Sequence, residues 1–130
     1  MKIIIGDERL EDILAIAKLT RTAFQNTDHS SHTEQFIVNA LRTHGQLTIS
    51  LVALENNQLV GHVAISPVTI SSGETGWYGL GPISVLPAKQ GQGIGTLLMQ
   101  AALDRLQNLG AQGLRSLIKN MKMQFLVPTV

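Results

Sequence analysis

The segment over residues 80–98 constrains the fold more than any other part of the chain. It reads Leu-Gly-Pro-Ile-Ser-Val-Leu-Pro-Ala-Lys-Gln-Gly-Gln-Gly-Ile-Gly-Thr-Leu-Leu, which predicts a β-strand, a glycine-rich turn and a helix that begins inside the turn. Such a turn gathers backbone N–H groups at a helix N-terminus, where they favour an anion. Glycine at Gly91, Gly93 and Gly95 removes the Cβ atoms that would hold a phosphate away. The segment therefore predicts a site for a phosphorylated cofactor.

Spacing excludes two common phosphate-binding motifs. A Walker A loop needs a lysine directly after its last glycine, but Thr96 follows Gly95. The dinucleotide fingerprint Gly-x-Gly-x-x-Gly fails in both registers, because its last position falls on Thr96 or on Leu98. A glycine-rich turn that serves packing alone stays an alternative. The spacing that does fit is Gln-x-x-Gly-x-Gly, at Gln90, Gly93 and Gly95.

This spacing resembles the acetyl-CoA pyrophosphate loop of the GCN5-related N-acetyltransferase (GNAT) family. The Gly-Pro-Ile-Ser-Val-Leu-Pro directly upstream is similar to the fourth strand of that family. Two further stretches look like a bacterial branch of predicted N-acetyltransferases: Leu59-Val-Gly-His-Val-Ala-Ile-Ser-Pro-Val-Thr and Gly76-Trp-Tyr-Gly-Leu-Gly-Pro. The likeness covers about residues 1–113, so we expect one GNAT-like acyltransferase domain over residues 1–130, with an atypical tail at 114–130.

The resemblance implies a mixed α/β fold and a reaction. The fold would be a central, mostly antiparallel, twisted sheet flanked by helices, in the order β-α-α-β-β-β-α, followed by an atypical short C-terminal strand. The co-substrate would be acetyl-CoA, and an acceptor amine would attack its thioester directly, without an acyl-enzyme. Backbone groups near Ile83 and Val85 would pair with the pantetheine arm, and the turn would hold the pyrophosphate. The implied cofactor-binding residues are Ile83, Ser84, Val85, Gln90, Gly91, Gln92, Gly93, Ile94, Gly95 and Thr96.

Hydrophobic periodicity predicts the same order of elements. Strands are expected at 2–5, 47–55, 58–68 and 77–85, and helices at 10–24, 33–43 and 93–109. The pair Asn56-Asn57 predicts a hairpin turn. The second helix is expected to bury Phe36, Ile37, Ala40 and Leu41. The third is expected to bury Ile94, Leu98, Ala101, Ala102 and Leu106.

The tail departs from the family pattern, in which a fifth strand, a short helix with a tyrosine and a final hairpin follow. Residues 114–130 contain no tyrosine, no acidic residue and no glycine, which suggests a truncated or frame-shifted end without the usual general-acid tyrosine. Residues 114–118 or 123–127 could still add a strand beside residues 77–85. An open sheet edge would otherwise remain, so a homodimer or a strand-exchanged oligomer is one expectation.

The catalytic residues stay unknown from the sequence. Tyr78 and His62 are candidates, although a packing role for Tyr78 and a structural role for His62 are the favoured interpretations. Glu74 reads as a solvated loop residue, and Glu34 reads as a complement to a helix dipole. The pair His29 and His32 has no third ligand at a suitable spacing, so no metal site is predicted.

Composition limits the class of function. The chain has 130 residues, a net charge of +1 and no cysteine, which favours a cytoplasmic domain without a nucleic-acid or membrane partner. The leading hypothesis is transfer of an acetyl group to a primary amine of a small molecule or protein. The alternatives are a catalytically impaired acyl-CoA-binding or regulatory protein, and an interaction module with an unused loop. The sequence does not identify the acceptor.

Overall fold

The computed structural model describes residues 2–25, 34–69, 73, 75–116 and 124–126. Within them lie six strands: β1 (Ile3–Asp7), β2 (Ile49–Glu55), β3 (Gln58–Pro67), β4 (Trp77–Val85), β5 (Gly113–Ser116) and β6 (Gln124–Leu126). The α-helices are α1 (Ile13–Phe24), α2 (Glu34–Thr43) and α3 (Ile94–Asn108), and two short 3-10 helices are η1 (Leu10–Asp12) and η2 (Pro87–Lys89). No helix in this described part is long and apolar enough to cross a membrane.

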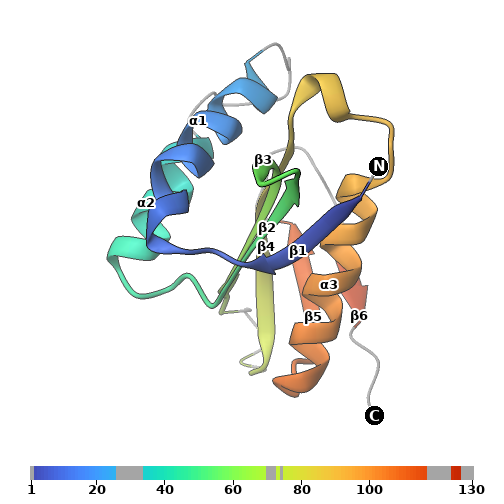
Figure 1. Cartoon of the computed structure of the whole chain (residues 1–130). Helices are drawn as coiled ribbons and strands as arrows, with labels where there is room; N and C mark the ends of the chain where they lie inside the picture. Colours follow the sequence, from blue (N-terminus) through green and yellow to red (C-terminus); the bar gives the residue numbers. More distant parts are fainter. Residues whose placement is uncertain (1, 26–33, 70–72, 74, 117–123, 127–130) are drawn as a thin grey trace.

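The strands form one sheet in their chain order, from β1 to β6. Neighbouring strands are antiparallel except β4 and β5, which are parallel because α3 returns the chain along the sheet between them. Figure 1 shows α1 and α2 on one face of the sheet and α3 on the other. The predicted mixed α/β fold, with a mostly antiparallel sheet flanked by helices, is confirmed.

The start of the first helix differs from the prediction. The helix expected over residues 10–24 is divided, so that η1 forms its first turn and α1 begins at Ile13. Asp12 stabilises this 3-10 turn, because its Oδ2 accepts hydrogen bonds from the backbone N–H and the Nε of Arg9, at 2.9 and 3.3 Å. The third helix begins at Ile94 rather than at Gly93, which serves as its N-cap.

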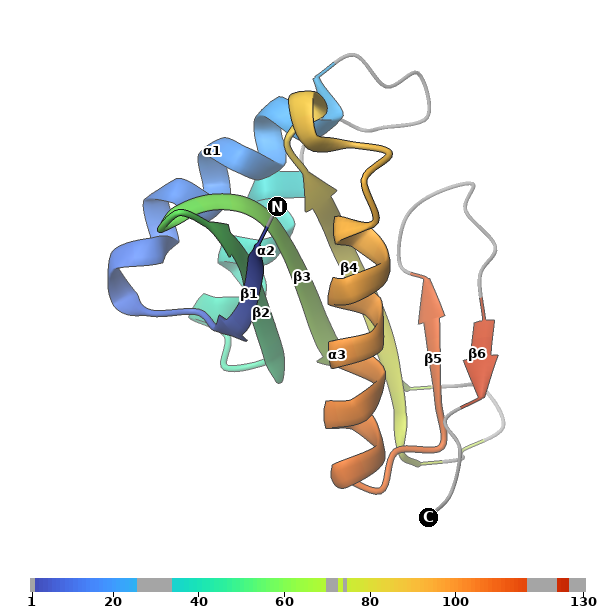
Figure 2. The same ribbon diagram turned by 45° about the vertical axis from the view of Figure 1, so that its right-hand side comes forward.

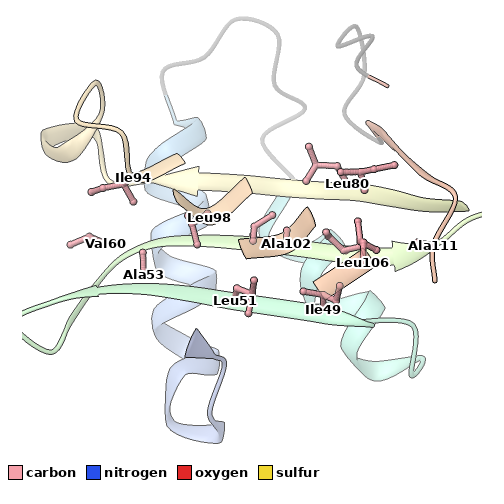
Figure 3. Close-up of a cluster of buried hydrophobic side chains, with 13 residues drawn as sticks. Ile49, Leu51, Ala53, Val60, Leu80, Ile94, Leu98, Ala102, Leu106 and Ala111 are labelled. Carbon is pink, nitrogen blue, oxygen red and sulfur yellow. The ribbon is translucent and has the colours of Figure 1, made fainter. Parts of the chain in front are cut away.

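Most of the buried apolar side chains lie between the sheet and α3 (Figure 3). Residues four apart share one face of a helix, and the buried face of α3 consists of Ile94, Leu98, Ala102 and Leu106. These side chains pack against the face of the sheet that carries Ile49, Leu51, Ala53, Val60, Val63, Ile65, Leu80 and Leu114. The predicted inward face of this helix is confirmed, with Ala101 only half-buried at its margin.

The second helix buries a different face from the predicted one. Phe36 is 62% exposed and Ile37 is 38% exposed, while Ala40 is exposed and Leu41 is half-buried. The buried residues of α2 are Glu34 and Val38, and Val38 packs in a small cluster with Ile16, Val52 and Ala64. The prediction was wrong because α2 carries apolar residues on two sides, and contact with α1 and the sheet decides which side is covered.

The tail supplies two strands where one was expected. The first of the two candidate segments provides β5, which runs parallel to β4 from Trp77 to Leu80. The second provides β6, which pairs with β5 and not with β4. Residues 117–123 and 127–130 lie outside the described residues.

Asn56 and Asn57 form the predicted turn between β2 and β3, with φ angles of 51° and 65°. Both angles lie in the left-handed region that a two-residue hairpin turn requires, and asparagine adopts it at less cost than a β-branched residue. We expect Asn57→Gly to keep or raise stability, and Asn57→Val to lower it by about 1–2 kcal/mol. Urea unfolding of both variants checks this, and equal losses would contradict it.

Candidate functional site

The edge of β4 that faces away from β3 is open over the second half of the strand. β5 pairs with β4 only from Trp77 to Leu80, and no other described strand pairs with this edge from Gly81 to Val85. In Figure 2 the two strands lie side by side at one end and separate toward the glycine-rich turn. A backbone edge is therefore available beside the turn.

The direction of the backbone groups along this edge follows from one hydrogen bond. The N–H of Leu86 donates to the carbonyl of Val60 at 2.9 Å, so Leu86 points toward β3. Backbone groups alternate in direction along a strand, which also turns Ser84 toward β3 and turns Ile83 and Val85 toward the open edge. These two residues are the ones expected to pair with an extended ligand.

A β-bulge lies where the pairing with β5 stops. Leu80 is opposite Ile65 and Ile83 is opposite Val63, so two residues, Gly81 and Pro82, face Ala64 alone. An extra residue of this kind bends its strand and increases the local twist. The bend occurs at the start of the open segment of β4.

The turn after β4 exposes the N-terminus of α3. Gly91 and Gly93 have φ angles of 78° and 89°, which glycine adopts without the steric cost of a Cβ. The first intrahelical bond runs from the Leu97 N–H to the Gly93 carbonyl at 3.1 Å, and the N–H groups of the first turn have no partner within the helix. They border a cavity of about 280 Å³ lined by Val85, Lys89, Gln90, Gly91, Gly93, Ile94, Gly95 and Thr96.

Two side-chain contacts hold the turn in place. Gln90 donates from Nε2 to the carbonyl of Val85 at 3.0 Å, which ties the turn to the last residue of β4. Lys89 pairs with Glu55 at 2.7 Å between Nζ and Oε1, which ties η2 to the end of β2. The first turn of α3 contains no acidic residue, so its positive end is not neutralised locally.

The structure brings together seven of the ten predicted cofactor-binding residues around this cavity, and places three of them elsewhere. Ile83 lies on the open segment of β4 beyond the cavity lining. Ser84 is buried with its side chain on the opposite sheet face from α3, and Gln92 is exposed outside the lining. Lys89 lines the cavity, although the sequence argument did not include it. A basic residue one position before the expected loop was the signal that could have found it.

The two catalytic candidates lie on opposite faces of the sheet. Tyr78 is half-buried and packs against the cluster beneath α3. His62 on β3 is fully buried, and this burial lowers its pKa to about 4, so the imidazole is neutral at neutral pH. Glu34, expected to complement a helix dipole, lies in the first turn of α2 and is buried. His29, His32 and Glu74 lie outside the described residues.

A polar cluster around His62 was missed by the sequence argument. Its Nε2 lies 2.7 Å from Ser50 Oγ, which donates to Glu8 Oε1 at 2.6 Å. Arg42 donates to both oxygens of Glu8, from Nη2 at 2.7 Å and Nε at 2.9 Å. Burial alone would raise the pKa of Glu8, but the hydrogen bonds from Arg42 and Ser50 outweigh it and hold that pKa below its ordinary value.

Comparison with known proteins identifies a family. Residues 13–125 match the profile described as the acetyltransferase (GNAT) family. The chain is 35% identical over 100 residues to the uncharacterized N-acetyltransferase YhbS of Escherichia coli strain K12. The match covers 76% of this chain and 57% of that protein, so the chain spans less than two thirds of the curated relatives' length.

Solved structures give the same result. A GNAT family acetyltransferase from Brucella melitensis in complex with acetyl-CoA is 47% identical, with a TM-score of 0.85 over 89% of this chain and 75% of that one. Escherichia coli YhbS in complex with CoA is 32% identical, with a TM-score of 0.81 over 90% of this chain and 63% of that one.

Proposed function

Because the chain belongs to the acetyltransferase (GNAT) family, we propose that it is an N-acetyltransferase that binds acetyl-CoA and acetylates a primary amine of a small molecule or protein. One observation carries the proposal: the open segment of β4 leads, through a glycine-rich turn, to a helix N-terminus that no side chain caps. The edge offers backbone pairing to an amide-containing arm, and the helix N-terminus offers N–H groups to a pyrophosphate. The relatives' complexes with acetyl-CoA and CoA support the choice of ligand.

Each part of the proposed site has its own role. Ile83 and Val85 hydrogen-bond the pantetheine arm, and the N–H groups over residues 90–96 hold the pyrophosphate. The acceptor nitrogen forms a bond to the thioester carbonyl carbon, the C–S bond breaks, and CoA leaves as the thiolate while the amine loses a proton. Tyr78 and His62 stay candidates for proton transfer, and the described residues favour neither. The cytoplasm is the proposed location, and a homodimer or a strand-exchanged oligomer is the proposed assembly.

The second candidate is a catalytically impaired acyl-CoA-binding or regulatory protein. The favouring observation is that His62 is neutral and buried, and that Tyr78 packs against the core, so neither is poised as a base. Both candidates predict cofactor binding, and only the first predicts turnover.

We expect calorimetry to detect acetyl-CoA binding with one site per chain, and a panel of primary amines to release CoA thiol in the presence of at least one acceptor. Desulfo-CoA is the control for non-specific thiol signal in the turnover assay. Binding without turnover across the panel would favour the second candidate. A folded protein that does not bind acetyl-CoA would overturn both.

A further inference from the structure

The polar cluster around His62, on the α1–α2 face of the sheet, joins four parts of the chain. Glu8 follows β1, Ser50 lies on β2 and His62 lies on β3, while Arg42 reaches them from the last turn of α2. Arg42 is also held by Asn39, whose Oδ1 accepts from Nη1 at 2.9 Å. The cluster therefore fixes the position of His62 from the solvent side.

The number of hydrogens in the cluster assigns the tautomer of His62. Ser50 has one hydroxyl hydrogen, and Glu8 as a carboxylate only accepts. If Ser50 donated to His62, two acceptor oxygens of Ser50 and Glu8 would lie 2.6 Å apart with no hydrogen between them. Ser50 therefore donates to Glu8, and His62 donates to Ser50 from Nε2–H. The other ring nitrogen, Nδ1, then carries a lone pair that needs a donor.

Two buried polar atoms next to this cluster have no partner among the described residues, His62 Nδ1 and Ser84 Oγ. Both side chains are almost completely buried, and the two residues are directly opposite in the β3–β4 pairing. Opposite residues in antiparallel strands have Cβ atoms about 5 Å apart, which places the polar atoms of their side chains within reach of one shared water molecule. Buried groups of this kind are commonly satisfied by an internal water.

We propose that one buried water molecule joins Ser84 to His62, accepting from the Ser84 hydroxyl and donating to Nδ1. His62 thereby acts as a positioning residue for the cofactor-binding segment of β4, which it connects to the Glu8–Arg42 ion pair. This inference rests on the proposed function. Ser84 lies between Ile83 and Val85, whose backbone groups face the open edge, so the bridge holds that edge in its binding geometry before the ligand arrives.

The first test is structural and does not depend on acetyl-CoA. A high-resolution crystal structure of the full chain is expected to show a water within about 3.2 Å of both Ser84 Oγ and His62 Nδ1. Nitrogen NMR of histidine-labelled protein is expected to show His62 protonated at Nε2 and accepting a hydrogen bond at Nδ1. The absence of the water, or protonation at Nδ1, overturns the proposal.

The second test is functional. Ser84→Ala removes one partner of the water, and we expect the Kd for acetyl-CoA to rise about three- to tenfold while the amount of folded protein is unchanged. Ser66→Ala is the matched control. Ser66 is a buried serine on the same face of the sheet as Ser84, but it lies on β3, opposite Gly79 and away from the open segment of β4.

The outcomes separate the two proposals. Unchanged affinity in Ser84→Ala, or equal losses in both variants, overturns the positioning role. A wild-type protein that does not bind acetyl-CoA overturns the proposed function and the positioning role together, while the water and the tautomer are still decided by the crystal structure and NMR.

Discussion

Gly95→Asp is expected to raise the Kd for acetyl-CoA by about 100-fold or more while leaving the fold intact. Gly95 is the second residue of α3 and lines the cavity at its N-terminus. A unit charge about 5 Å from one phosphate charge costs roughly 3 kcal/mol at an effective dielectric constant of about 20. In the absence of ligand the same aspartate complements the helix dipole, so stability is expected to stay level or rise. Binding and stability therefore move in opposite directions.

Gly95→Asn is the matched control, because asparagine has nearly the same size without the charge. A Cβ at Gly95 would lie 3.9 Å from Val85 Cγ2, an ordinary contact, so the backbone tolerates either side chain. We expect the asparagine variant to bind about tenfold more weakly than wild type at most. Gly93 is a poorer test, since its φ of 89° strains any side chain. Near-wild-type affinity in Gly95→Asp would place the pyrophosphate elsewhere.

The second large effect is a loss of stability in mild acid. The pKa of His62 is about 4 in the folded protein, against 6.5 as its ordinary value. Above pH 6.5 the imidazole is neutral in both states and does not alter stability. Between pH 6.5 and 4 the unfolded chain takes up a proton that the folded protein does not, so stability falls by about 1.4 kcal/mol per pH unit, or about 3 kcal/mol in total.

The charged groups around His62 act in both directions. Burial is the largest cause of the low pKa, and Arg42 from α2 lowers it further. Glu8 after β1 and Asp12 in η1 raise it, without offsetting the burial. The pKa of Glu8 is lowered from 4.5, so Glu8 begins to reduce stability only as the pH falls below about 4.5, at the acid end of this window.

Urea unfolding at half-unit steps from pH 7.5 to 4 measures this slope. We expect His62→Gln to start from a lower stability and to lose most of the pH dependence. His44→Gln is the matched control, because His44 is exposed after α2 and its replacement should leave the slope intact. Equal slopes in wild type and His62→Gln would show that other groups cause the acid sensitivity.

The glycine-rich turn between β4 and α3 could be predicted from the sequence because its information is local. The strand, Gln90, the three glycines and the apolar face of α3 all fall within residues 77–106, so their order and spacing are visible in one short stretch. The hairpin turn at Asn56 and Asn57 was predictable for the same reason.

The face of α2 and the cluster at His62 were not predictable in this way. Phe36 and Ile37 are as apolar as Val38, and only tertiary contact with α1 and the sheet selects Val38 for burial. Glu8 and Arg42 lie 34 residues apart, and Glu8 and Ser50 lie 42 apart. Charged and hydroxyl residues at such separations carry no shared periodic signal. The same distance in the chain hid the ion pair of Lys89 with Glu55.

β4 contains one more residue than the segment of β3 opposite it. In a regular strand, residues three apart lie on opposite faces of the sheet, yet Leu80 and Ile83 both face α3. Without Pro82 they would be two apart, and the side chains on either side would keep their present faces. Pro82 is itself buried, and as the extra residue it also bends the strand. Removing it would lose its own packing contacts, but would straighten the strand toward β5 and narrow the gap between them. In this fold one extra residue divides β4 into a part that pairs with β5 and a part whose outer edge no other described strand covers.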